Sequence, residues 1–139
     1  MQVFVDASVY VAIRNKNDSN HKKALILSQK LFQKKAEFIT SNIVIYEVYT
    51  VLSMKIDKAT ALGFHDRILK ENLPIIYMTE ELEEEAWRMF EKEKSKNVSY
   101  FDFTSFAIIK NLKIKSMFSF DKDFKRFAKR EGLNFNLTQ

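Results

Sequence analysis

The chain has 139 residues, of which 46% are hydrophobic, so it is long enough to fold as one domain with a sizeable core. It contains no cysteine, which excludes disulfides and thiolate metal sites and leaves oxygen atoms as the natural metal ligands. The net charge of +5 permits a polyanionic partner. No run approaches the roughly 18 apolar residues of a membrane span, and no charged leader precedes the first apolar run, so we expect a cytoplasmic protein without a membrane partner.

Short strands alternate with helices along the whole sequence. In chain order, the apolar pattern and the capping residues predict a strand at 2–5, helices at 8–14 and 21–34, a strand at 38–40, helices at 43–55 and 58–72, a strand at 75–78, helices at 80–94 and 100–111, a strand at 115–120, a helix at 122–130 and a strand at 134–137. This alternation favours an α/β fold, in which a mainly parallel sheet lies between helices.

Two acids directly follow predicted strands. Asp6 comes after residues 2–5, and Asp121 comes after residues 115–120. Ligands bind at the carboxyl ends of parallel strands, because loops and helix N-termini converge there. Both acids also precede a helix, so each could simply cap that helix, and Asp123 could share either role.

Two further acids lie on helix faces that are predicted to point inward. Glu47 interrupts an apolar stripe that includes Val44 and Val48, and Asp102 shares a face with Phe106. An unpaired carboxylate on a packed face is costly, so it needs a cation, a hydrogen-bond network or a raised pKa. Simpler alternatives are that Glu47 reaches solvent and that Asp102 closes a capping box. Together the four acids indicate a crowded negative pocket suited to Mg²⁺ or Mn²⁺.

With these acids in view, the chain resembles the PIN-domain family, in particular the toxin ribonucleases of VapBC-type toxin–antitoxin pairs. The resemblance is carried by residues 3–8, 40–47, 99–102 and 119–124, in the family's order and spacing. It implies a single domain over residues 1–139, a three-layer α/β/α sandwich around a mainly parallel sheet of four or five short strands. It also implies an endoribonuclease that depends on Mg²⁺ or Mn²⁺, and a homodimer that is inhibited by a small antitoxin protein. The residues that the resemblance assigns are the catalytic acids and metal ligands Asp6, Glu47, Asp102 and Asp121, the further metal ligand Asp123, and the catalytic hydroxyl residue Ser119.

An acidic pocket repels RNA, so cations around it must hold the strand. The candidates for RNA binding are Arg14, Lys122, Lys125 and Arg126. Tyr100 and Phe101 could stack an unpaired base, although Phe101 is expected to pack in the core instead.

Two other functions remain open on the sequence alone. One is a catalytically inactive PIN-like domain that binds RNA or assembles with partners and keeps its acids for structure. The other is a phosphotransfer domain or phosphatase that uses Asp6 as its nucleophile, which leaves the position of Glu47 unexplained. The RNA target, the choice of metal and the dimer interface are not set by the sequence.

Overall fold

The computed structural model describes residues 1–133 and 136–139. Its elements are β1 (Gln2–Val5), α1 (Ala7–Arg14), α2 (His21–Gln33), β2 (Glu37–Ser41), α3 (Asn42–Lys55), α4 (Lys58–Glu71), β3 (Ile75–Ile76), α5 (Glu80–Lys92), α6 (Tyr100–Asn111), β4 (Ser116–Phe118), α7 (Asp123–Arg130) and β5 (Asn136–Thr138). Each predicted element is present within a few residues of its predicted limits. Of the last predicted strand, residues 134 and 135 lie outside the described residues.

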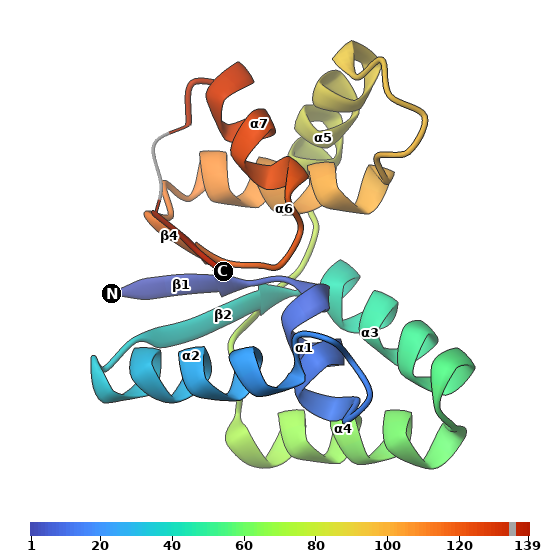
Figure 1. The fold of residues 1–139 in the computed structure, drawn as a ribbon. Coiled ribbons are helices and arrows are strands. Elements are labelled where there is room, and N and C mark those ends of the chain that lie inside the picture. The colour runs from blue at the N-terminus through green and yellow to red at the C-terminus, as the bar shows by residue number, and fades with distance from the viewer. Residues whose placement is uncertain (134–135) are drawn as a thin grey trace.

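The described strands form an all-parallel sheet between two layers of helices. The strand order is β3-β2-β1-β4-β5. Helices α1 to α4 cover one face of the sheet and α5 to α7 cover the other, as Figure 1 shows. The predicted α/β fold is therefore confirmed. Because the chain continues from β1 to β2 on one side and returns to β4 on the other, the strand order reverses between β1 and β4, which is the usual ligand-binding position in such sheets.

The central strand β1 explains why its sequence reads as a continuous apolar run. It pairs with β2 on one edge and with β4 on the other, and Val3 and Phe4 are fully buried. A strand covered by helices on both faces needs apolar side chains in both directions. Its burial fixes the place where the following residue, Asp6, leaves the sheet.

Helix α6 is the most buried helix of the layer formed by α5, α6 and α7. Seven consecutive residues, Phe103 to Ile109, are buried, because α5, α7 and the sheet all pack around the helix. The ring of Phe106 lies 4.8 Å from that of Phe124 on α7, in an edge-to-face arrangement. This packing holds the N-terminal ends of α6 and α7, and therefore the acids near them, in place.

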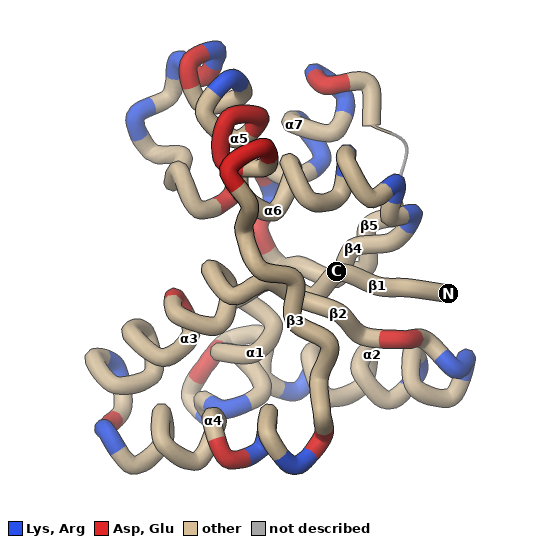
Figure 2. Tube along the Cα trace, turned by 180° about the vertical axis from the view of Figure 1, so that it is seen from behind, with Lys and Arg blue, Asp and Glu red and all other residues tan. Residues whose placement is uncertain are grey.

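Other acids gather at the start of α5. Glu80, Glu81 and Glu83 crowd the first turn of α5, where the positive end of the helix dipole favours them. Figure 2 shows these acids at the start of α5. None of the helices in the described part of the chain has the length and apolarity that a membrane span requires.

Candidate active site

Asp6 and Asp121 end neighbouring strands and are linked through Ser119. The Asp6 side chain is nearly buried, and its Oδ2 accepts hydrogen bonds from Ser8 Oγ at 2.8 Å and from Ser119 Oγ at 3.0 Å. Ser119 Oγ in turn accepts a hydrogen bond from the backbone N–H of Asp121 at 3.0 Å. One hydroxyl group therefore fixes the distance between the ends of β1 and β4.

Asp6 also caps a helix, as the simpler alternative predicted, whereas the N-cap position of α7 is held by Lys122 and not by Asp121. Asp6 Oδ2 accepts from the backbone N–H of Ser8 at the start of α1, and Asp121 Oδ1 accepts from the backbone N–H of Asp123 at 2.9 Å. Within residues 1–133 and 136–139, the hydrogen bonds to each acid fall on one of its two oxygens. The second oxygen of each carboxylate is left for another ligand.

Asp102 and Glu47 are both half-buried, and their carboxylates form no hydrogen bond with any described residue. Ser99 caps α6 by accepting from the backbone N–H of Phe101 at 3.2 Å, but the Asp102 carboxylate closes no capping box there. Burial, and then the negative charges of Asp6, Asp121, Glu47 and Asp123, raise the pKa of Asp102 to about 8. These charge effects mean that the carboxylates lie within electrostatic reach of one another.

The pKa of Glu47 is raised to about 7, by burial first and then by the charges of Asp6 and Asp121. Burial also raises the pKa of Asp6, against the lowering effect of its two serine hydrogen bonds. The prediction that Glu47 sits within a packed stripe agrees with its neighbours, because Val44 and Val48 are buried. Asp6, Glu47 and Asp102 are thus easier to protonate than in water, chiefly because burial disfavours their charged forms and, for Glu47 and Asp102, also because of nearby negative charges.

Other poorly exposed carboxylates in the chain have cationic partners. Glu85 pairs with Lys110 at 2.7 Å, and the nearly buried Glu131 pairs with Arg88 at 3.0 Å. By contrast, no ion pair in the described part of the chain involves the four acids Asp6, Glu47, Asp102 and Asp121. Asp123, further out, lies 3.8 Å from a guanidinium nitrogen of Arg126.

The chemistry of this donor set fits a hard divalent cation. It offers only oxygen atoms, from carboxylates that have no other cation, and Mg²⁺ and Mn²⁺ prefer such ligands. In their present conformations, no three Asp, Glu or His side chains among the described residues are close enough together to hold one ion. The acids therefore share one electrostatic environment without forming a closed set of ligands, and side-chain rotation would be needed to bring them onto one ion.

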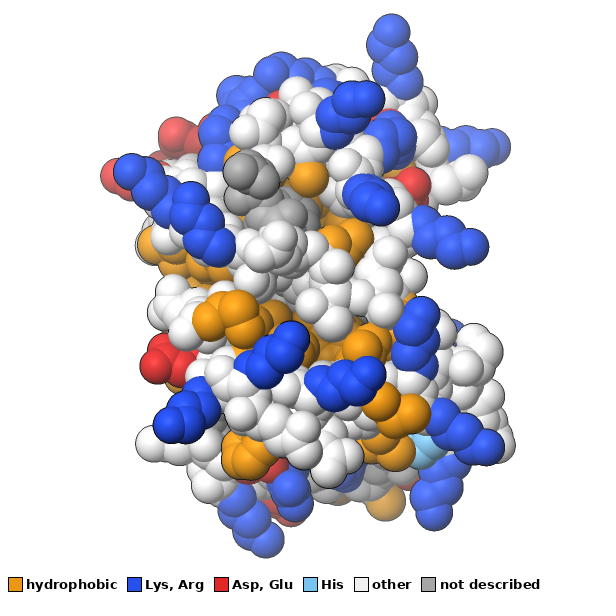
Figure 3. Space-filling model, turned by 60° about the vertical axis from the view of Figure 1, so that its left-hand side comes forward, with side chains coloured by type: hydrophobic (Ala, Val, Ile, Leu, Met, Phe, Trp, Pro, Cys, Tyr) orange, Lys and Arg blue, Asp and Glu red, His pale blue; other side chains and the backbone are white. Residues whose placement is uncertain are grey.

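The predicted RNA-binding cations lie in different places. Lys122 and Lys125 are exposed near the start of α7, close to Asp121 in the sequence. Arg14 instead ends α1, eight residues from Asp6, where it lines a cavity of about 460 Å³ together with residues of β1, α2 and α4. On the face that Figure 3 shows, Lys and Arg side chains are spread over both helical layers.

The aromatic residues beside Asp102 correct one prediction. The expectation that Phe101 packs in the core is wrong, because Phe101 is 49% exposed at the first turn of α6. Tyr100 is half-buried, and its ring lies 6.1 Å from that of Trp87. Trp87, 55% exposed on α5, was not identified from the sequence, since only the fold brings it next to α6.

Comparison with known proteins identifies a family and several similar proteins. The model of the PIN domain matches residues 3–130. The 23S rRNA-specific endonuclease VapC20 of Mycobacterium tuberculosis, in two strains, is 30% identical over 123 residues, which cover 88% of this chain and 91% of that protein. The crystal structure of Mycobacterium tuberculosis VapC20, described as a sarcin-ricin loop cleaving toxin, matches with a TM-score of 0.78 at 29% identity, covering 89% of this chain and 93% of that chain. VapBC2 from Rickettsia felis, crystallised with a DNA fragment from their promoter, shares the fold at a TM-score of 0.70 and 18% identity over 100% of both chains. The resemblance seen in the sequence is confirmed, and the chain belongs to the PIN-domain family.

Proposed function

We propose that this chain is an endoribonuclease that uses a divalent metal ion, and that it is the toxin of a VapBC-type toxin–antitoxin pair. The observation that carries the proposal is that the charges of Asp6, Glu47 and Asp121 all act on the half-buried Asp102, while no ion pair in the described part of the chain involves any of these four acids. Asp6 follows β1, next to the point where the strand order of the sheet reverses. The relative VapC20 is named a 23S rRNA-specific endonuclease, which supports RNA as the substrate class. PIN-domain nucleases generally depend on divalent metals, which supports the cofactor.

In this proposal Asp6, Asp102 and Asp121 hold Mg²⁺ or Mn²⁺, with Asp123 as an outer ligand. When bound, such an ion would neutralise negative charge on the scissile phosphate and would lower the pKa of a water molecule bound to it. Ser119 keeps Asp6 oriented by its hydrogen bond, so that the free oxygen of Asp6 faces the site. Glu47, with a pKa of about 7, exchanges a proton near neutral pH and is suited to orient and deprotonate the attacking water.

RNA binding is assigned to residues that surround the acids. Lys122 and Lys125 are exposed and free to contact phosphates, and Phe101 offers an exposed ring next to Asp102 on which an unpaired base can stack. Exposed apolar residues such as Met54 and Trp87 leave surface for the proposed homodimer and antitoxin. An RNA substrate places the proposed activity in the cytoplasm.

The test is cleavage of ribosomal RNA by the purified chain, with Mg²⁺, with Mn²⁺ and with EDTA. We expect cleavage that needs a metal ion and that falls at least a hundredfold in Asp102→Asn. Asp66→Asn is a matched control, since Asp66 lies exposed on α4, and it should cut as the wild type does. Equal cutting by the wild type and Asp102→Asn would remove the proposal. RNA binding without any cleavage would favour the inactive RNA-binding domain, and a covalent aspartyl-phosphate on Asp6 would favour the phosphotransfer domain.

A further inference from the structure

Three charged side chains connect the end of α5 with the acid that begins α7. Glu93, which follows α5 as its C-cap, has a side chain that is only 4% exposed. Its Oε1 lies 3.4 Å from Nη1 of Arg126, and Nη2 of the same guanidinium lies 3.8 Å from Oδ1 of Asp123. We call this arrangement the Glu93–Arg126–Asp123 link. In this link the guanidinium of Arg126 is shared between the buried carboxylate of Glu93 and the candidate metal ligand Asp123.

The Glu93 end of the link is firmly held. Its carboxylate accepts a hydrogen bond from the backbone N–H of Ser95 at 2.9 Å, and its Oε2 lies 3.0 Å from Nη1 of Arg130. Arg130 is fixed in turn by donating to the carbonyl oxygen of Met89. Burial works to raise the pKa of Glu93, but Ser95 and the two guanidinium groups outweigh it and lower that pKa. Glu93 is therefore a permanent negative charge in a fixed position.

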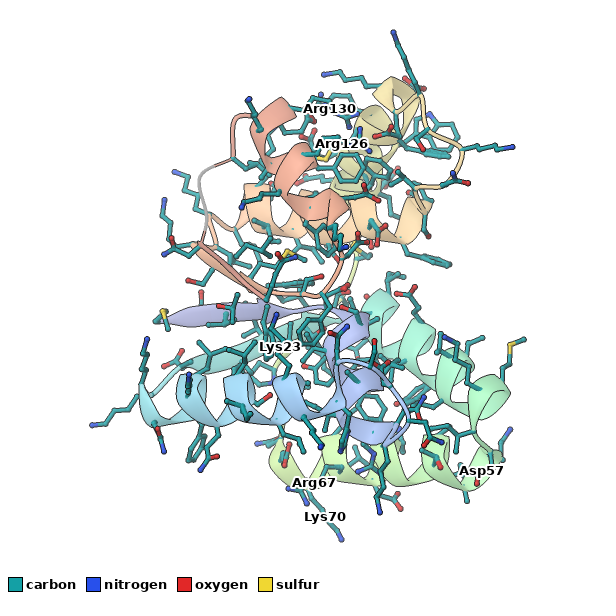
Figure 4. All side chains as sticks on the ribbon, in the orientation of Figure 1. Lys23, Asp57, Arg67, Lys70, Arg126 and Arg130 are labelled. Atoms are coloured by element: carbon teal, nitrogen blue, oxygen red, sulfur yellow. The ribbon has the colours of Figure 1, made fainter. Side chains whose placement is uncertain are left out.

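The backbone of α7 does not depend on the link. Phe124 and Phe127, both buried, pack against Phe106 with ring centroids 4.8 Å and 5.2 Å apart. Phe127 also contacts Phe103 at 5.0 Å. The Arg126 guanidinium lies between α7 and α5 in Figure 4, where it pairs with Glu93 and also lies 4.6 Å from the centroid of the Phe127 ring. Losing Glu93 would therefore move a charge more than it would move the helix.

We propose that Glu93 is a positioning residue for the metal site: it holds the Arg126 guanidinium back, so that Asp123 and the acids behind it stay open to a divalent cation. The inference rests on the proposed function, since it assumes that these acids bind a metal. Without Glu93, the guanidinium would be free to close the gap to Asp123, because planar guanidinium groups bind carboxylates through two parallel hydrogen bonds. Arg126 was predicted from the sequence to bind RNA; this proposal instead gives it an effect on metal binding at Asp123.

The experiment measures the affinity for Mn²⁺ without RNA, by isothermal titration calorimetry or by the electron paramagnetic resonance of free Mn²⁺. We expect Glu93→Gln to weaken Mn²⁺ binding about three- to tenfold, because a positive charge comes to lie beside the ion. Arg126→Gln should tighten binding by a similar factor. Its side chain is half exposed, so this variant tests the proposal even where Glu93→Gln does not fold.

The double variant separates positioning from plain electrostatics. When Arg126 is already glutamine, replacing Glu93 should change the affinity by less than twofold, because the cation that Glu93 holds back is gone. If Glu93 acted only through its own charge, the two effects would add. Arg130→Gln is the matched control: it removes the other ion pair of Glu93 and should leave the affinity within twofold.

The outcomes distinguish this inference from the proposed function. If the wild type binds Mn²⁺ and Asp102→Asn does not, the metal site stands. An unchanged affinity in both Glu93→Gln and Arg126→Gln, or additive effects in the double variant, would then overturn the link alone. A wild-type chain that binds no Mn²⁺ would overturn both proposals together.

Discussion

Replacing Asp102 with asparagine should stabilise the metal-free protein while it removes the activity. Asp102 is half-buried, its carboxylate accepts no hydrogen bond from the described residues, and it experiences the charges of four other acids. In the unfolded chain its carboxylate is solvated and loses its proton freely. Folding at neutral pH therefore requires either that a proton binds or that a charge is buried among like charges. Asparagine has nearly the same shape and avoids both costs.

The magnitude follows from the pKa of Asp102, which rises from 3.8 to about 8 on folding. Because the folded pKa lies above the unfolded one, the destabilisation is absent below about pH 4, grows as the pH rises, and is complete above about pH 8. At about 1.4 kcal/mol for each pKa unit, its upper limit at pH 7 is about 4 kcal/mol. Solvent reaches part of the side chain, so we expect about half of that, roughly 2 kcal/mol.

The assay is urea unfolding in EDTA at pH 4.5 and pH 8. At pH 8 the upper limit is about 6 kcal/mol, so by the same halving Asp102→Asn should be more stable than the wild type by about 3 kcal/mol, and the two should agree within about 0.5 kcal/mol at pH 4.5. Asp66→Asn, which changes an exposed acid on α4, should stay within about 0.5 kcal/mol of the wild type at both pH values. Added Mn²⁺ should stabilise the wild type but not Asp102→Asn. A variant that is no more stable than the wild type at pH 8 would refute the reasoning.

Three further substitutions test other parts of the site. Glu47→Gln should lower RNA cleavage at least a hundredfold with an unchanged circular dichroism spectrum, and a loss of less than tenfold would remove Glu47 from the catalytic group. Ser119→Ala leaves Asp6 and the backbone N–H of Asp121 without their partner, so urea unfolding should show a loss of about 1–3 kcal/mol; a neutral result would contradict the link between the two strand ends. Phe101→Ala should cost less than about 1 kcal/mol of stability, because the ring is 49% exposed, but should raise the KM for RNA severalfold. An unchanged KM would exclude base stacking on Phe101.

The positions of Asp6 and Asp121 could be predicted because the information is local. Each follows a buried strand, and in a parallel sheet the ends of neighbouring strands meet at one edge. The predicted helix limits were also nearly right, because Ser41, Asp57, Thr79 and Ser99 form the side-chain caps that their types indicate. Local propensity and the global fold agree at these points.

The surroundings of the site could not be predicted because they depend on distant segments. Arg126 pairs with Glu93, which lies 33 positions earlier in the chain and meets α7 only through the packing of α5. Phe101 was expected in the core because it is a large apolar residue, yet its place on the first turn of α6 directs it outward. Arg14 was grouped with the RNA-binding cations by charge alone, whereas α1 carries it away from Asp6. The charge and hydrophobicity of a residue can be read from the sequence, but the residues that surround it in the fold cannot.

The helix-capping role of Asp6 is compatible with its proposed role as a metal ligand. A capping hydrogen bond occupies one carboxylate oxygen and fixes the side-chain rotamer, and Asp6 and Asp121 each keep a second oxygen without a bond to any described residue. Part of the side-chain conformational entropy that a metal ligand loses on binding is therefore already lost when the protein folds. The same positive helix end that favours the cap also offsets some of the repulsion between the acids. The carboxylates of Asp102 and Glu47 accept no such hydrogen bond from the described residues, and burial with nearby negative charge raises their pKa values to about 8 and about 7, so we expect their replacement to stabilise the metal-free site.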